Sequence, residues 1–512
     1  MYPGTHAAQF PDKPAVVMAD SGVTLTYGQL DEQSRRLARV FQDSGLRKGD
    51  HIAMLSDNVP EVFVVYWAAL RSGLYITMVN HHLAPAEISY IINDSGSTAL
   101  VAATGVREQA EAVLDDIPAV KVRLALRGDV PGFDSYEDAL ADTSAEPLSS
   151  QPAGSDMLYS SGTTGRPKGI KMPLPDRQVD EPGSPLMLFA HLYGFDADTV
   201  YLSPAPTYHA APLRFSGVVQ SMGGTVVVMD RFDAEGALAA IEKHRITHSQ
   251  WVPTMFVRML KLPHEIRARY NTSTLKVAIH AAAPCAIEVK KSMIDWWGPI
   301  LYEYYSSTEG NGVTFIDSAT WLTRPGSVGS PALGVLHICD EEGSELPAGQ
   351  AGLVYFERDE LPFSYHNDAE KTRSASHPAH ETWTTTGDIG YVDDDGYLFL
   401  TDRKAFMIIS GGVNIYPQEI ENALALHPAV LDVAVIGVPD AEMGESVKAV
   451  VQPADPSADQ ETLATELTEF LRERIARYKV PRSFDFTDTL PRTPTGKLAK
   501  GLVRQKYWEG AQ

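Results

Sequence analysis

The feature that most restricts how this chain can fold is the alternation of strand and helix patterns over about its first 130 residues. Short apolar runs suited to strands are separated by stretches in which apolar residues recur with helical period. Such alternation predicts mostly parallel sheets covered by helices, because parallel strands need a crossover between them. We therefore expect an α/β fold that opens with a hairpin (14–19 and 23–27) and continues with strands at 51–56, 75–80, 98–103 and 122–126 and helices at 28–45, 59–72 (amphipathic), 87–93 and 107–116.

The pattern changes after residue 335, where shorter strands and turns replace the alternation. The last hundred residues predict a small α+β unit, with helices at 419–426 and 460–477 and strands at 433–438, 447–451 and 483–486. A chain of 512 residues also exceeds the roughly 250–300 residues at which a single core stops growing. A large N-terminal domain followed by a smaller one is therefore expected.

The charge balance restricts the kind of partner. Lysine and arginine number 43 against 66 aspartates and glutamates, which gives a formal net charge of −23. A field of that sign repels nucleic acid and anionic membrane surfaces, so we expect no nucleic-acid partner. An anionic substrate would need a site that is locally positive.

Cysteine content and hydropathy bear on the compartment. Cys285 and Cys339 are too few for a disulfide framework and are expected to be reduced thiols. The first residues carry no basic segment followed by an apolar run, so no signal peptide is expected. The apolar stretches are too short for a membrane span. We expect a cytoplasmic protein without an integral membrane segment.

A locally positive site is indicated by the run at 159–169, which reads YSSGTTGRPKG. Its glycines allow the backbone to turn tightly, so that amide groups can face an anion, while hydroxyls supply donors and a lysine supplies charge. The spacing differs from that of a Walker A sequence. The alternative is a flexible Gly/Ser/Thr loop without a ligand. The candidate ligand-binding residues are Ser160, Ser161, Gly162, Thr163, Thr164, Gly165 and Lys168.

The run resembles the phosphate-binding signature of the adenylate-forming superfamily, which includes acyl- and aryl-CoA synthetases, nonribosomal-peptide adenylation domains and firefly-type luciferases. Further motifs of that superfamily follow in order at 304–310, 386–391, 401–404, 410–420 and 494–497. The resemblance implies a large domain (1–402) and a small, mobile C-terminal domain (403–512). It also implies a reaction in two steps. A carboxylic acid and ATP form acyl-AMP and pyrophosphate, and coenzyme A then takes the acyl group and releases AMP.

The resemblance also implies roles for single residues around ATP. The loop from Ser160 to Lys168 would hold the β- and γ-phosphates, Thr308 would touch the α-phosphate, and Glu309 with Thr164 would hold Mg²⁺. Lys497 would stabilise charge between carboxylate and α-phosphate during adenylation. Asp388, supported by Arg403, would accept hydrogen bonds from both ribose hydroxyls. Adenine would lie against Ala282, Ala283, Pro284, Tyr302, Glu303, Tyr304 and Tyr305.

For the second step, the resemblance places Ser410, Gly411 and Gly412 along the pantetheine tunnel. The small domain of the family rotates between the two steps about a hinge residue that is usually acidic or lysine. Ala405 stands at that position in this chain, so the hinge assignment stays open.

The acyl pocket is the least specific part of the pattern. His209 would lie at its mouth, and the alternative is a packed surface histidine. Small residues near the site favour a roomy pocket for a medium-chain, long-chain or bulky hydrophobic acid, although Ser306 stands where the family usually has glycine. The candidate wall residues are Phe215, Gly217, Trp251, His280, Ala281, Ser306 and Gly310.

Several functions share these motifs. A stand-alone adenylation enzyme would deliver the acyl group to a carrier protein, and a luciferase-like oxygenase would perform the same first step. A nucleotide-binding module would bind ATP without chemistry. The partners expected from the reading we favour are the carboxylic acid, ATP and coenzyme A, and a homodimer is compatible with the sequence.

Overall fold

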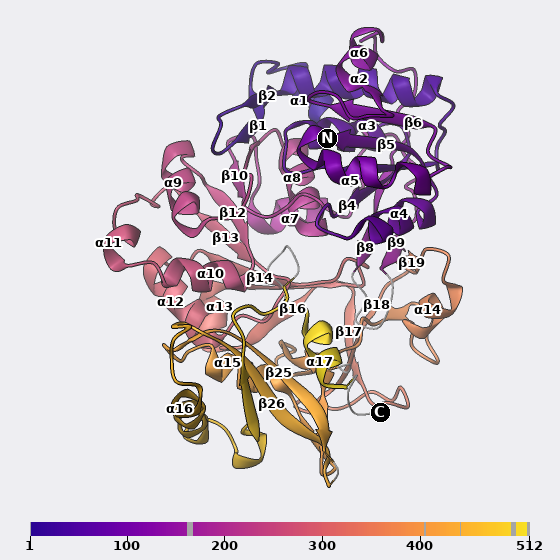
Figure 1. Cartoon of the computed structure of the whole chain (residues 1–512). Helices are drawn as coiled ribbons and strands as arrows, with labels where there is room; N and C mark the ends of the chain where they lie inside the picture. The colour runs from indigo at the N-terminus through magenta and orange to yellow at the C-terminus, as the bar shows by residue number, and fades with distance from the viewer. Residues whose placement is uncertain (1, 161–166, 404–405, 441, 493–497, 509–512) are drawn as a thin grey trace. The chain divides into compact units, whose positions relative to one another are not determined.

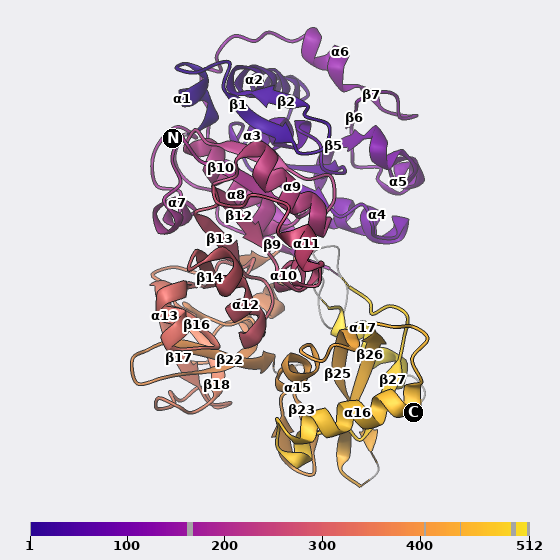
Figure 2. The same ribbon diagram turned by 90° about the vertical axis from the view of Figure 1, so that its left-hand side faces the viewer.

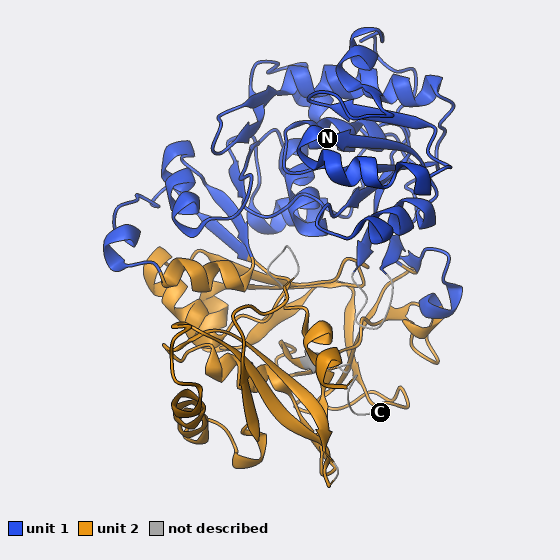
Figure 3. Cartoon of the chain, viewed as in Figure 1, with its two compact units in different colours: residues 1–251, 262–279, 362–372 blue, residues 252–261, 280–361, 373–512 orange. Residues whose placement is uncertain are grey.

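The structure, a computed structural model, describes residues 2–160, 167–403, 406–440, 442–492 and 498–508, with Asp402 and Arg403 described by their backbone alone. The chain divides into two compact units, each assembled from segments that lie apart in the sequence (Figure 3). Unit 1 comprises residues 1–251, 262–279 and 362–372, and unit 2 comprises residues 252–261, 280–361 and 373–512.

One sheet of unit 1 contains the predicted parallel strands. Its order is β19-β9-β8-β4-β3-β5-β6-β7, and it is parallel from β7 to β8 and antiparallel from β8 through β9 to β19. The strands are β3 (His51–Leu55), β4 (Tyr75–Val79), β5 (Ser97–Ala103), β6 (Val122–Leu126), β7 (Asp134–Ser135), β8 (Ser155–Ser160), β9 (Lys168–Lys171) and β19 (Ser364–Tyr365). The α/β alternation predicted from the sequence is therefore confirmed.

Helices accompany this sheet in the alternating order that was predicted (Figure 1). They are α1 (Pro3–Ala7), α2 (Tyr27–Asp43), α3 (Glu61–Leu70), α4 (Pro85–Asp94), α5 (Arg107–Ala112) and α6 (Tyr136–Ala141). Helix α2 begins at a capping box, because Thr26 accepts from the backbone of Gln29 and the Gln29 side chain accepts from the backbone of Thr26.

The prediction that the helix at 59–72 is amphipathic is wrong. Helix α3 is buried along nearly its whole length, from Val62 to Ala69. It packs against α2 on one side and against β3, β4 and β8 on the other, so no face meets solvent. A helix enclosed in this way tolerates apolar residues all round, which is what its sequence shows.

The second sheet of unit 1 has the order β2-β1-β11-β10-β12-β13. The predicted hairpin is confirmed, because β1 and β2 pair antiparallel, while β1, β10 and β12 join parallel neighbours. Strand β13 carries its last residue, His280, into unit 2. The elements are β1 (Pro14–Met18), β2 (Thr24–Thr26), β10 (Val200–Ser203), β11 (Thr225–Val228), β12 (His248–Trp251), β13 (Val277–His280), α7 (Met187–Tyr193), α8 (Ala210–Ser221), α9 (Ala234–His244) and α11 (His264–Arg267).

Unit 2 contains an antiparallel sheet of order β17-β18-β21-β22-β16-β15-β14, with β20 paired to β18. Its strands are β14 (Leu301–Tyr305), β15 (Val313–Asp317), β16 (Ser327–Leu333), β17 (Val335–Cys339), β18 (Gly352–Glu357), β20 (Trp383–Thr384), β21 (Asp388–Val392) and β22 (Leu398–Arg403). The helices in this part are α10 (Pro253–Leu260), α12 (Ile287–Trp297) and α13 (Ser318–Thr323), and α14 (Ala369–Ser374) spans the division between the units.

The predicted small α+β portion is confirmed at the C-terminal end of unit 2 (Figure 2). The predicted helix at 460–477 ends earlier, at Arg472. The predicted domain boundary after residue 402 falls within β22 and stays a prediction. The elements are β23 (Ile408–Ser410), β24 (Val413–Ile415), α15 (Pro417–Leu424), β25 (Val430–Asp440), β26 (Gly444–Pro453), α16 (Gln460–Arg472), β27 (Ser483–Phe486) and α17 (Lys500–Trp508).

Among the residues that the structure describes, no helix has the length and apolar character needed to cross a bilayer.

Buried histidines in unit 1 predict a stability that depends on pH. Burial lowers the pKa of His51 and of His248 from 6.5 to about 4. Between these values the unfolded chain takes up protons that the folded chain does not, so the free energy of unfolding falls as pH falls, by roughly 1.4 kcal/mol per pH unit for each histidine. We expect the melting temperature, measured by calorimetry, to fall between about pH 6.5 and pH 5.

The variant His248→Gln cannot titrate at this position and serves as the matched control, with a shallower fall in melting temperature over the same interval. A melting temperature that stays constant or rises as pH falls toward 5 would contradict this assignment.

Candidate active site

The run at 159–169, which we call the phosphate-loop motif, lies on a hairpin of unit 1. Ser160 ends β8 and Lys168 begins β9, and the two residues are register partners in the antiparallel pair. Partners in such a pair have Cα atoms about 4.5–5.5 Å apart, so the two ends of the motif are close together. Residues Ser161, Gly162, Thr163, Thr164 and Gly165 lie outside the described residues.

Lys168 is held by an acidic residue that the sequence reasoning missed. Its Nζ lies 3.1 Å from Oδ2 of Asp368, and 5.8 Å from the centre of the Tyr365 ring. A backbone hydrogen bond from Lys371, followed by the hydrogen bond from Lys168, lowers the pKa of Asp368. Asp368 follows β19, which pairs with β9, so strand pairing brings together two residues 200 positions apart.

His209 stands at the beginning of helix α8 beside a buried tyrosine. Burial lowers the pKa of His209 to about 3, so its imidazole is neutral at ordinary pH. The ring centres of Tyr208 and His209 are 4.5 Å apart. Within the described residues, neither His209 Nε2 nor Tyr208 Oη has a hydrogen-bond partner. A neutral imidazole and a phenol are thus both available to a polar ligand.

The wall candidates of unit 1 are packed side chains. Phe215 is buried in an aromatic cluster, with its ring centre 4.8 Å from that of Phe189 and 5.9 Å from that of Tyr193. A Cβ at Gly217 would lie 3.0 Å from the Tyr66 ring, so only glycine fits without a shift. Trp251 is buried and donates to Ser249 Oγ at 2.6 Å. Helix α8 therefore carries Phe215 and Gly217, with His209 at its N-cap.

The predicted ribose residues meet in unit 2. Asp388 is buried, and its Oδ2 accepts hydrogen bonds from Tyr305 Oη and Thr386 Oγ1, each at 2.7 Å. Arg403 is the register partner of Asp388 between β21 and β22. Two neutral hydroxyls thus help to orient the carboxylate. Thr386 was missed as a functional residue, although it begins the 386–391 motif.

The turn after β14 carries Thr308, Glu309 and Gly310. Glu309 is 8% exposed. Ser306 Oγ donates to the Gly312 carbonyl at 2.8 Å, and Arg358 Nη1 donates to the Gly310 carbonyl at 3.1 Å, so the backbone of the turn is fixed at both ends. A buried carboxylate next to hydroxyl-bearing residues supplies the hard oxygen ligand that Mg²⁺ prefers.

The predicted adenine segments are connected by a buried ion pair. Glu303 Oε2 accepts from Lys290 Nζ at 2.6 Å, and both side chains are buried. Strand alternation puts Tyr302 and Tyr304 on the opposite face of β14 from Glu303. Lys290 was missed because a lysine in a helix beside Lys291 is expected to be exposed.

The glycine turn at 410–412 connects β23 and β24 in unit 2. Ser410 is buried, while Gly411 and Gly412 have φ of 58° and 79°, which other residues rarely adopt. A Cβ at Gly411 would lie 2.4 Å from Met443 Cε. The predicted tunnel role of this turn stays a prediction.

Lys497 and Ala405 lie outside the described residues. The residues that flank the Lys497 segment are described, and Arg492 and Leu498 form an isolated antiparallel bridge. Arg492 also donates from Nε to Asp432 Oδ2 at 2.6 Å.

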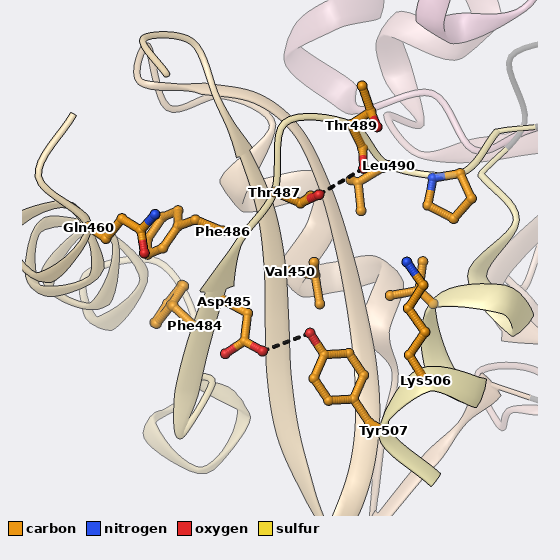
Figure 4. A pocket seen from close by; sticks show the side chains of 12 residues that line it. Val450, Gln460, Phe484, Asp485, Phe486, Thr487, Thr489, Leu490, Lys506 and Tyr507 are labelled. Carbon is orange, nitrogen blue, oxygen red and sulfur yellow. Dashed lines mark hydrogen bonds between the residues drawn. The ribbon is translucent and has the colours of Figure 1, made fainter. Parts of the chain in front are cut away.

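A cavity of about 390 Å³ lies between β27, the segment 487–491 and helix α17 (Figure 4). Its main acidic group, Asp485, already accepts from Tyr507 Oη and Lys448 Nζ, each at 2.7 Å. None of the candidate site residues lines this cavity.

Comparison with known proteins identifies the family of this chain. The family model for AMP-binding enzymes matches residues 4–365, and the model for the C-terminal domain of AMP-binding enzymes matches residues 419–497. The chain belongs to the AMP-binding enzymes. The superfamily that the motifs resemble is thereby confirmed, and so is the fold.

Full-length relatives of this AMP-binding enzyme include acid–CoA ligases. A feruloyl-CoA synthase of Amycolatopsis is 32% identical over 499 residues, which cover 96% of each chain. A long-chain-fatty-acid–CoA ligase of Mycobacterium tuberculosis is 31% identical over 502 residues, covering 97% of this chain and 96% of the relative. The crystal structure of ATP-bound MatB from Rhodopseudomonas palustris is 28% identical, covers 100% of both chains and superposes with a TM-score of 0.82.

The cysteines of this AMP-binding enzyme are expected to be unreactive. Burial, and then the carboxylate of Glu303, raises the pKa of the Cys285 thiol to about 12. Cys339 is fully buried, and burial raises its pKa as well. Because the thiolate is the reactive form, the native enzyme should not react with a disulfide reagent within minutes at about pH 8. Denatured enzyme, the control, should release two equivalents of thiol. Rapid labelling of one native thiol would show this prediction to be wrong.

Proposed function

We propose that this AMP-binding enzyme is an ATP-dependent acyl-CoA synthetase that activates a hydrophobic carboxylic acid as acyl-AMP and transfers the acyl group to coenzyme A. The observation that carries the proposal is the buried Asp388 carboxylate, oriented by Tyr305 and Thr386 with Arg403 opposite. A buried carboxylate held in one orientation suits a vicinal diol such as the ribose of ATP. The family match over both parts of the chain supports the same reading.

In the first step, an oxygen of the acid attacks the α-phosphorus of ATP, and pyrophosphate leaves with the electron pair of the broken bond. Two anions must approach one another, so donors and positive charge are needed around the phosphates. Lys168, the loop from Ser160, Thr308 and Lys497 would supply them. Glu309 and Thr164 would hold Mg²⁺, which when bound neutralises charge on the phosphate oxygens.

In the second step, the thiol of coenzyme A attacks the acyl carbonyl and AMP leaves. Ser410, Gly411 and Gly412 would lie along the path of the pantetheine chain. A Cβ at Gly412 would meet nothing within 4 Å, so there is room beside the main chain at that residue, while Met443 occupies the space beside Gly411. We also propose a cytoplasmic location, which two free thiols and the need for ATP and coenzyme A favour.

The proposed acid is bulky and hydrophobic, either aromatic or a medium- or long-chain fatty acid. The aromatic cluster around Phe215 supports this choice, since it offers a rigid apolar wall. A polar substituent of the acid would form hydrogen bonds with the neutral side chains of His209 and Tyr208. Relatives with either kind of substrate are equally similar to this chain.

The acid panel is the first test. We expect AMP release from ATP with hydroxycinnamic, benzoic or C8–C16 fatty acids, and a much faster release when coenzyme A is present. Turnover of acetate alone would overturn the proposed acid. Acyl transfer to a carrier protein but not to coenzyme A would favour the alternative of a stand-alone adenylation enzyme.

Lys497 is the second test. The variant Lys497→Ala should lose acyl-AMP formation by about a hundredfold or more, because it removes charge stabilisation that acts in the adenylation transition state. Thioester formation from synthetic acyl-AMP should change little. The two half-reactions are measured separately, and Lys506→Ala is a matched control from the same portion of the chain. Equal losses in both half-reactions would contradict the assigned role.

Asp388 is the third test. With Asp388→Asn, the KM for ATP should rise about tenfold, because a carboxylate accepts hydrogen bonds more strongly than an amide. The wild-type enzyme should prefer ATP over 2′-deoxy-ATP, and the variant should lose most of that preference. A variant that still discriminates between the two nucleotides would place the ribose elsewhere.

A further inference from the structure

Unit 2 contains a fully buried group of charged and polar side chains beneath the predicted adenine segments. We call Glu303, Lys290, His280 and Trp321 the Glu303 cluster. Lys290 and His280 are 0% exposed, Glu303 is 5% exposed and Trp321 is 1% exposed. Lys290 Nζ lies 2.6 Å from Glu303 Oε2 and 4.7 Å from the centre of the Trp321 ring.

His280 completes the cluster from the opposite side. Its Nε2 lies 3.6 Å from Glu303 Oε2, which is beyond hydrogen-bond length, and its ring centre is 5.5 Å from that of Phe256. Among the described residues, neither nitrogen of His280 has a hydrogen-bond partner. Burial lowers the pKa of His280 well below its usual value, so the ring is neutral and Lys290 is the cation that balances Glu303.

A pair this deeply buried is poorly explained by stability alone. Taking two charges out of water is unfavourable, and apolar replacements of both partners are often as stable or more stable. The pair does, however, define one geometry, because a short hydrogen bond between a lysine and a carboxylate fixes both backbones that carry them. A positioning role is therefore the better explanation.

Two members of the cluster flank the predicted adenine segment in the sequence. His280 ends β13, Lys290 lies in the first turn of α12, and the chain between them includes Ala282, Ala283 and Pro284. Ala282 has φ of 74°, a conformation that is strained for a residue with a Cβ and persists only where its surroundings impose it. Glu303 itself lies between Tyr302 and Tyr304 on β14.

We propose that Glu303 is a positioning residue for the nucleotide: through Lys290 it locks helix α12, and with it the strained segment at Ala282, onto strand β14. The family resemblance places Glu303 itself against adenine, whereas in this proposal its buried carboxylate, bonded to Lys290, acts from behind the neighbouring tyrosines. It sets the spacing between two segments that would contact adenine, and this role rests on the proposed function, in which those segments bind ATP.

Two single variants and their combination test this role. Glu303→Gln leaves the charge of Lys290 buried without a counter-charge, and Lys290→Met leaves the carboxylate unpaired, so both should lower the melting temperature. The combination E303Q/K290M removes both charges and should recover the melting temperature. All three should bind the non-hydrolysable analogue α,β-methylene-ATP about tenfold more weakly in calorimetric titration, because the segment at Ala282 is no longer fixed.

Asp31→Asn is the matched control, since Asp31 pairs at 2.7 Å with the buried Arg71 in unit 1. It should lower the melting temperature and leave nucleotide binding unchanged. In turnover assays the variants of the cluster should raise the KM for ATP and leave the KM for the acid unchanged.

The result that overturns the proposal is a combined variant that binds the analogue as tightly as the wild-type enzyme, because the cluster would then be structural only. Absence of analogue binding by the wild-type enzyme would also overturn it. If the wild-type enzyme binds the analogue but releases no AMP with any acid, the proposed acid activation fails, while weaker binding by the variants still supports the positioning role.

Discussion

The parallel pairing of β3, β4, β5, β6 and β8 is the constraint on which unit 1 depends. Parallel strands need a crossover between each pair, so helices must cover the sheet and its strands must be apolar on both faces. The pairing becomes antiparallel at β9. That change produces a hairpin in a sheet built from crossovers, and the hairpin carries the phosphate-loop motif. The position of the motif thus follows from the point at which the parallel order ends.

In this strongly acidic chain, two lysines near the candidate site each form an ion pair with an acidic residue. Lys168 is held beside Asp368, and Lys290 beside Glu303, so each of these cations has a nearby acid. Asp388 instead accepts hydrogen bonds from two neutral donors, the hydroxyls of Tyr305 and Thr386. A neutral donor fixes the direction of a carboxylate without reducing its strength as an acceptor.

Most of the fold could be predicted because its signals are local. Strand β6 and the small α+β portion at the C-terminal end follow from runs of a few residues. Helix α3 shows the limit of that reasoning, since whether its second face meets solvent depends on α2 lying across it. Among the site residues, Asp388 could be found from its motif, whereas Asp368 and Lys290 carry no local signal. A lysine on a polar helix and an aspartate in a loop are ordinary surface residues until their partners are known.

The sequence by itself determined the class of fold, the order of the nucleotide motifs and the family, because periodicity, glycine-rich turns and motif spacing are encoded within a few neighbouring residues. Only the tertiary structure decided which charged groups meet. Lys168 forms a hydrogen bond with Asp368, which lies 200 positions away in the sequence, and Tyr305 forms one with Asp388, 83 positions away. Lys290 in helix α12 forms one with Glu303 in strand β14. These contacts depend on strand register and helix packing, which arise from interactions between distant segments. For that reason the sequence alone did not predict the buried Glu303 cluster, which we infer to hold the adenine segments in place.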